Sequence, residues 1–105
     1  MKTFAKQPND VLDYDVDMTE WFSGIPGDEI ERVEIVVRSE AEDIPALLAG
    51  PLPHPPSVLM GASPLSFKVW LGGGTAYIDY IVTCLINTEQ DRQKEVEFRV
   101  KVRDL

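Results

Sequence analysis

Hydrophobic and charged residues alternate most regularly near the C-terminal end of the chain. From Glu95 to Arg103, a valine or a phenylalanine occupies every second position, and a charged residue occupies each position between them. A period of two places all the apolar side chains on one face of an extended strand and all the charged ones on the other. This stretch is therefore predicted to be a strand with one buried and one solvated face.

Two more strands are predicted in front of it. Residues 77–87 are apolar at nearly every position and rich in β-branched and aromatic side chains, which is typical of a central strand covered on both faces. The short polar connection at 88–92 fits a hairpin loop. Residues 67–71 alternate and stop at the glycines 72–74, where we expect a tight turn with positive φ.

The N-terminal half contains weaker patterns. Residues 29–38 alternate and predict a fourth strand, whereas 12–17 alternate less regularly and indicate an edge strand. Residues 18–22 fit one helical turn with Asp17 as its N-cap, and 58–60 fit a short strand. Since no stretch has a long 3.6-residue period with caps, we predict an all-β fold, a small antiparallel β-sandwich.

The inward positions of these strands define a predicted core. Its members are Val33, Ile35, Val37, Val69, Tyr80, Val82, Cys84, Phe98, Val100 and Val102. Ile81 and Leu85 are expected to be covered on the opposite face of the central strand, because that strand is apolar on both faces.

Charge and proline content divide the single predicted domain (residues 1–105) into regions. The chain carries 18 acidic and 10 basic residues, and its net charge of −8 arises entirely within residues 1–43. Residues 44–66 carry no charge and hold six of the eight prolines. We therefore expect an acidic N-terminal arm with an edge strand at 1–28, a proline-rich loop at 44–66, and the C-terminal strands at 67–105.

The same composition excludes several classes of protein. A net charge of −8 argues against binding to nucleic acid or to an anionic membrane surface. No apolar run approaches the roughly 20 residues that span a bilayer, and no signal peptide is predicted. The single cysteine excludes an internal disulfide and a cysteine-based zinc site.

One acidic motif has the appearance of a metal site. Asp13, Asp15 and Asp17 have the spacing of the first ligands of a calcium loop. Such a loop needs glycine at its sixth position and glutamate at its twelfth, where this chain has Met18 and Gly24. We expect the solvated face of an edge strand, with a weak surface cation site as the alternative.

No other residue carries convincing chemistry. His54 lies in an uncharged proline run, and Cys84 lies in the middle of an apolar strand, where a buried thiol is not a nucleophile. The glycines 72–74 lead into a strand, whereas a phosphate cradle needs a helix N-terminus. We therefore predict a protein that is not an enzyme and has no catalytic, cofactor or metal site.

Two blocks of sequence form a recognisable pattern. The first reads KQPNDVLDYDVD at residues 6–17, TEW at 19–21 and GDEI at 27–30. The second reads VWLGGGT at 69–75, YIVT at 80–83 and NT at 87–88, and extends to Arg92. Together they resemble the small Ig-like structural proteins of tailed bacteriophages that are called fiber-tail adaptor proteins.

Two positions and one segment differ from the pattern of that family. Met18 stands where an aromatic residue is frequent, and Asp91 stands where a hairpin glycine is common. The proline-rich segment 44–66 is longer than the usual link between strands, so nothing is carried over from the family to that region.

The resemblance implies a non-enzymatic structural component of the virion, assembled in the cytoplasm of the bacterial host. Such an adaptor would join the tail or neck to a fibre or to a neighbouring ring through contacts with other virion proteins and with further copies of itself. The alternative is a free-standing Ig-like module that recognises a carbohydrate or a host surface, with Trp70 and Tyr77 as an exposed aromatic platform.

Candidate partner-binding residues come from the apolar side chains of the arm and of the proline-rich loop. They are Leu12, Tyr14, Trp21, Phe22, Leu47, Leu48, Leu52, Pro53, Pro55 and Pro56. Aromatic anchors are typical of interface hot spots, and a stiff proline segment loses little entropy on docking. Both sets would also pack on the domain itself, and the sequence leaves these alternatives open.

Overall fold

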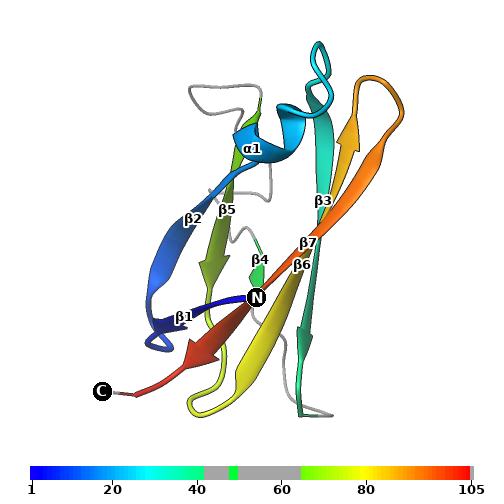
Figure 1. The fold of residues 1–105 in the computed structure, drawn as a ribbon. Coiled ribbons are helices and arrows are strands. Elements are labelled where there is room, and N and C mark those ends of the chain that lie inside the picture. Colours follow the sequence, from blue (N-terminus) through cyan, green and yellow to red (C-terminus); the bar gives the residue numbers. More distant parts are fainter. Residues whose placement is uncertain (42–47, 50–64, 105) are drawn as a thin grey trace.

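The computed structural model describes residues 1–41, 48–49 and 65–104, which form two β-sheets that enclose a common apolar core (Figure 1). One sheet has the order β1 (Lys2–Lys6), β7 (Gln93–Val102), β6 (Asp79–Thr88), β3 (Ile30–Ser39). The other has the order β2 (Val11–Asp17), β5 (Ser66–Gly72), β4 (Leu48–Ala49). The short helix α1 (Thr19–Phe22) follows β2. The predicted all-β sandwich is confirmed.

The β6–β7 hairpin forms the centre of the first sheet. Val82 lies opposite Phe98 and Tyr80 lies opposite Val100, and all four side chains are buried in the core. The predicted central and C-terminal strands are therefore confirmed. In the described part of the chain, no helix has the length and apolar character that crossing a membrane requires.

The outer face of β6 is covered differently from our expectation. Ile81 is buried, but its neighbours across the sheet are Arg38 and Arg99. Leu85, which we expected to be covered, is only half-buried. The aliphatic stems of long charged side chains cover this face while their charged ends reach water.

Three predicted core residues are less buried than expected. Val33, Ile35 and Val37 pack against the core but are only partly buried. Their strand, β3, is an edge strand of its sheet. The strand of the second sheet that contacts it, β4, has only two residues. Because β3 lies at a sheet edge and faces so short a strand, its inward side chains stay partly exposed to solvent.

Strand β1 was not predicted. It pairs with the second half of β7 in parallel, with Lys2 opposite Phe98 and Lys6 opposite Val102. This pair departs from the purely antiparallel arrangement that we expected. Lys6 is buried, and its ammonium donates hydrogen bonds to the carbonyl oxygens of Gln7 (2.7 Å) and Gly73 (2.6 Å). Burial lowers the pKa of Lys6, although the charge of Asp10 opposes the shift.

The expected N-terminal arm is thus part of the sandwich. Its two strands, β1 and β2, are edge strands of different sheets, and α1 lies at one end of the second sheet (Figure 1). Met18 and Phe22, at the start and end of the helical turn, are buried in the core. The formal N-cap is Met18 rather than Asp17, which corrects our expectation. Asp17 still accepts a hydrogen bond from the backbone N–H of Thr19 (3.0 Å).

The turns at both ends of β6 use positive φ. Gly73 and Gly74 have φ of 77° and 95°, which confirms the tight glycine turn after β5. At the hairpin, Asp91 has φ of 65°, so it adopts the left-handed conformation that a glycine would adopt without strain. Aspartate adopts this conformation more readily than most residues, so Asp91 can stand where family members commonly have a hairpin glycine.

We expect substitutions at Asp91 to follow this geometry. A β-branched residue is strained in the left-handed region, so Asp91→Val should lower the free energy of unfolding by about 1–2 kcal/mol. Asp91→Gly removes the strain and should leave stability unchanged or raise it by less than about 1 kcal/mol. Urea denaturation of the three proteins checks this ranking. Equal stability of the Val and Gly variants would contradict it.

Candidate interaction site

The aromatic candidates of the arm face mainly inward. Tyr14 and Phe22 are buried in the core, so they support the domain's own packing. Trp21 is half-buried, with its ring centroid 4.8 Å from that of Phe22. Leu12 is 39% exposed. Of these four, Leu12 and Trp21 have surface that a partner can reach.

The candidates of the proline-rich loop fall mostly outside the described residues. Leu47, Leu52, Pro53, Pro55 and Pro56 lie there, as do His54 and the short strand expected at 58–60. Leu48 belongs to β4, whose backbone pairs it with Gly72. A partner-binding role for this loop stays a prediction.

The three aspartates of β2 are all engaged within the chain, two of them with the same lysine. Lys68, on β5, lies 2.7 Å from an oxygen of Asp13 and 3.4 Å from an oxygen of Asp15. The hydrogen bond from Lys68 lowers the pKa of Asp13, and the pKa of Lys68 is raised by the same contact. Asp17 turns to Thr19 instead. Among the described residues, no group of three or more His, Cys, Asp or Glu side chains is arranged to hold a metal ion.

Cys84 is fully buried in the core, in the middle of β6. Burial alone raises the pKa of its thiol to about 12. The thiolate is the reactive form of cysteine, so Cys84 acts here as a small apolar side chain.

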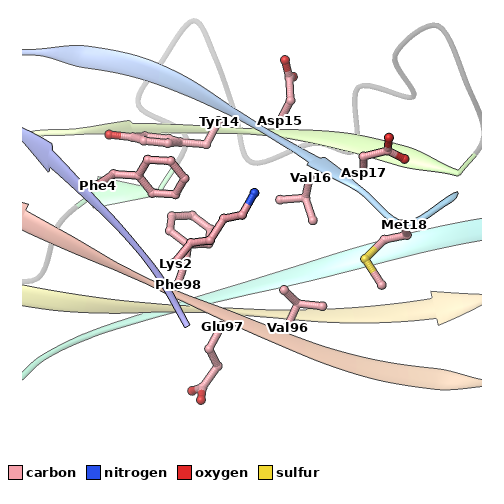
Figure 2. Close-up of a pocket in the computed structure, with 10 residues that line it drawn as sticks. All are labelled: Lys2, Phe4, Tyr14, Asp15, Val16, Asp17, Met18, Val96, Glu97 and Phe98. Carbon is pink, nitrogen blue, oxygen red and sulfur yellow. The ribbon is translucent and has the colours of Figure 1, made fainter. Parts of the chain in front are cut away.

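A groove opens between the two sheets where β7 extends beyond β1 (Figure 2). Its volume is about 330 Å³. The residues that line it come from β1, β2, β7 and the start of α1: Lys2, Phe4, Tyr14, Asp15, Val16, Asp17, Met18, Val96, Glu97 and Phe98. Figure 2 shows Val16, Met18 and Val96 directed into the space, whereas the carboxylates of Asp15 and Glu97 point away from it.

An aromatic cluster closes one end of this groove. The ring centroids of Phe4, Tyr14 and Phe98 lie 5.1–5.6 Å apart, within the range of favourable aromatic contacts. The buried hydroxyl of Tyr14 has no hydrogen-bond partner in the part of the chain that the structure describes. Burial raises the pKa of this hydroxyl, and the charges of Asp10 and Asp13 add to the shift.

Sequence reasoning missed the groove because its walls belong to different sheets. The alternation along β2 and β7 predicts which side chains point inward, but it does not reveal that β1 pairs only with residues 98–102 of β7. Among the strands that the structure describes, Val96 therefore has a neighbour on the β6 side, Cys84, and none on the other side. The only sequence signal for the groove was the apolar character of Val16 and Val96, and the same character is expected of ordinary core residues.

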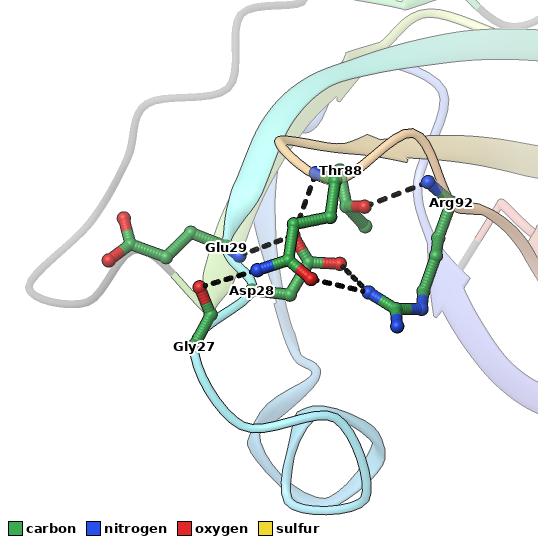
Figure 3. A network of polar contacts seen from close by, with 6 residues as sticks. Gly27, Asp28, Glu29, Thr88 and Arg92 are labelled. Carbon is green, nitrogen blue, oxygen red and sulfur yellow. Dashed lines mark hydrogen bonds and ion pairs between the residues drawn. The ribbon is translucent and has the colours of Figure 1, made fainter.

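A buried carboxylate organises the loop end of the β6–β7 hairpin (Figure 3). The side chain of Asp28 is fully buried. One of its oxygens accepts hydrogen bonds from the backbone N–H groups of Glu29 (2.9 Å) and Gln90 (3.1 Å). The other lies 2.9 Å from the guanidinium of Arg92. Asp28 thus joins the start of β3 to the hairpin loop.

The hairpin loop adds further contacts to this network. Arg92 also bonds the side-chain oxygen of Gln90 (3.0 Å), whose amide nitrogen donates to the carbonyl of Gly27 (3.2 Å). Thr88 accepts a hydrogen bond from the backbone N–H of Arg92 (3.0 Å). The loop is therefore fixed relative to the segment that enters β3.

The electrostatics of Asp28 follow from these contacts. Burial acts to raise its pKa, but hydrogen bonds from Thr88, Arg92 and the N–H groups of Gln90 and Glu29 outweigh burial, and the net shift is downward. Asp28 is therefore ionised at neutral pH. The group supports the local fold, since all these partners belong to the chain itself.

The network also explains why two distant sequence motifs belong together. Gly27 and Asp28 come from the GDEI motif of the N-terminal block, while Thr88 and Arg92 come from the end of the C-terminal block. The structure brings these residues into direct contact (Figure 3). We had treated the motifs as short structural signatures and had not singled out Asp28.

Comparison with known proteins identifies a family whose match spans both motifs. No curated protein matches the chain. A family described as podophage GP4 fiber-tail adaptor protein gp77 matches it over residues 6–101. That range contains the Asp28 network, the aspartates of β2 and nearly all of the groove. Since the match covers most of the chain, the protein belongs to the podophage GP4 fiber-tail adaptor family.

Proposed function

We propose that this protein is a non-enzymatic structural adaptor in the virion of a tailed phage, where it joins the tail or neck to a fibre or to a neighbouring ring. The observation that carries the proposal is the family match over residues 6–101. Assembly would take place in the host cytoplasm, before the particle is released. Partners would be other virion proteins and further copies of the chain, rather than nucleic acid or membrane.

The arrangement of side chains supports a binding role. Several described titratable groups act in ion pairs and networks within the chain, as Asp13 with Lys68 and Asp28 with Arg92. The negative net charge of −8 would steer the protein toward a basic surface on its partner. The proline-rich segment 44–66 supplies an uncharged, apolar stretch of a kind that serves as a docking surface.

The carbohydrate-binding alternative receives less support. Tyr77 is 69% exposed, but Trp70 is half-buried on β5 and does not form an open platform. Sugar recognition by stacking would need aromatic faces that are both open to solvent and adjacent.

Quantitative mass spectrometry of purified virions tests the proposal. A structural adaptor should be present in many copies in every particle, in a fixed ratio to the major tail proteins. Particles assembled without the chain should lack fibres while their heads remain complete in electron micrographs. Virions that contain none of the protein and carry normal fibres would overturn the adaptor role.

A further inference from the structure

We propose that the open half of β7 and the groove beside it bind an extended segment of a neighbouring virion protein, which adds to the first sheet as an extra strand. The segment would alternate apolar residues with lysine or arginine. This inference rests on the proposed adaptor function and assigns to it a contact site, at residues 93–97 of β7 together with Val16, Met18 and Val96.

The first argument is the direction of the backbone groups of β7. Val102 exchanges hydrogen bonds with the segment before β6, from Tyr77 N–H (2.7 Å) and to Ile78 C=O (3.2 Å), whereas Arg103 N–H donates to Lys6 C=O on the β1 side (2.9 Å). Backbone groups alternate in direction along a strand. Gln93 and Glu95 are an even number of positions from Arg103. Their N–H and C=O groups therefore point to the same side of β7, the side on which β1 lies further along the strand.

The second argument is that this edge already accepts a strand. Strand β1 pairs with residues 98–102 of β7, and the pairing stops at Lys2. In the described part of the chain, no strand pairs with residues 93–97 on that side. An unpaired strand edge of this kind is a template for strand addition. The incoming strand would pair with the same edge of β7 that β1 pairs with further along.

The third argument is the groove beneath the open edge. A strand added beside residues 93–97 would direct every second side chain between the two sheets, because side chains alternate with the pleat. Val16, Met18 and Val96 line the space of about 330 Å³ at this point (Figure 2). Apolar side chains of the added strand would fill it and would bury apolar surface that is now open.

The negative charge of the protein favours a basic binding partner in the groove. The rim of the groove carries the exposed side chains of Asp15 and Asp17, although Asp15 also lies 3.4 Å from Lys68. Glu97 points away from the groove and is paired with Arg38 (3.2 Å). Lys2 is exposed, so its flexible side chain can move aside when a strand enters. The net charge of −8 of the chain favours lysine or arginine at the outward positions of the added strand. A second copy of this chain, with its own excess of acids, fits the rim poorly.

The decisive variant is Glu95→Pro, with Glu95→Ala as its matched control. Proline removes the N–H that points to the open edge, and its ring blocks an incoming strand. The ladder between β7 and β6 is kept, because the N–H of residue 95 does not face β6. Both variants lose the same carboxylate, so any difference between them reports on the backbone edge.

The variants are tested as full chains that complement particles lacking the wild-type protein, with occupancy measured by mass spectrometry. We expect Glu95→Ala to retain wild-type occupancy and Glu95→Pro to fold, by circular dichroism, yet to lose about tenfold or more in occupancy. Wild-type occupancy of a folded Glu95→Pro would overturn the strand-addition site. Absence of the wild-type protein itself from virions would instead overturn the adaptor function, and the site with it.

A second pair of variants keeps the test decisive if the proline variant does not fold. Val16→Glu places a charge in the groove, whereas Val11→Glu places it on an exposed position of the same strand. We expect only Val16→Glu to lose occupancy. A photo-cross-linker at Val16 should capture a basic, apolar segment of another virion protein. Capture of a second copy of this chain, or equal occupancy of both variants, would contradict the proposal.

Discussion

Replacement of Phe98 by alanine should destabilise the protein by about 3–5 kcal/mol. Phe98 is only 4% exposed and belongs to the core between the two sheets. Its ring contacts Phe4 and Tyr14, with centroids 5.6 Å away in both cases. Truncation removes these contacts and joins a new void to the groove. Because a domain of this size is stable by only about 5–15 kcal/mol, the variant should unfold at a much lower urea concentration.

Phe4→Ala is the matched control for this prediction. Phe4 belongs to the same aromatic cluster but is 36% exposed, so its truncation removes less buried surface and should have a clearly smaller effect. Urea denaturation, followed by tryptophan fluorescence, measures both. A loss below about 1 kcal/mol for Phe98→Ala would mean that β7 presents its other face to the core.

Replacement of Asp28 by asparagine should produce the second large effect. An amide has only one acceptor oxygen, so the substituted side chain cannot serve both the N–H groups of Glu29 and Gln90 and the guanidinium of Arg92. Its NH₂ group would face one of these donors. The contact with Arg92 would be lost, and we expect a fall in Tm on the order of ten degrees. Asp13→Asn, at an exposed ion pair with Lys68, should change Tm little.

The effect of Asp28→Asn should depend on pH in a defined direction. The pKa of Asp28 is lowered from its ordinary value of 3.8, so the folded state favours the ionised form. The resulting stabilisation is complete above the ordinary pKa and is lost as the pH falls through the lowered, folded-state pKa. The difference in Tm between the wild type and the variant should therefore be constant from neutral pH to about pH 5 and should shrink below about pH 4.

Thermal denaturation from neutral pH into strong acid measures this difference directly. A gap between wild type and variant that stays constant down to the lowest pH would show that the carboxylate charge contributes nothing and that only the shape of the side chain matters. A gap that widens in acid would contradict the sign of the shift.

Local patterns along the chain predicted most of the strands. Alternation identified β7, β5 and β3, and the apolar run identified β6 as a central strand, because side-chain direction in a strand depends only on position along the chain. The positive φ of the glycine turn was predictable from its composition, since glycine alone adopts that conformation freely. The motifs that resemble the adaptor family also lie in the sequence itself, and the family match over residues 6–101 confirms the resemblance.

Pairing between distant segments was decided only by the tertiary structure. Strand β1 has one large apolar residue, Phe4, and gains its strand conformation from hydrogen bonds to β7. Val33, Ile35 and Val37 have a regular alternating pattern but are only partly buried, since burial depends on what lies opposite. Ile81 lies between Arg38 and Arg99, which no rule of periodicity predicts.

The contact sites depended on the tertiary structure in the same way. Sequence reasoning left open whether Tyr14 and Phe22 pack on the domain itself or bind a partner, and both side chains are buried in the core. Asp28 and Arg92 are 64 positions apart and form a pair only because the start of β3 and the hairpin loop meet at one end of the sheet. Among the strands that the structure describes, residues 93–97 of β7 are unpaired on one side because β1 pairs only with residues 98–102. Amino-acid order determines which face a side chain takes, whereas the neighbours of that face are set by how the two sheets close on each other.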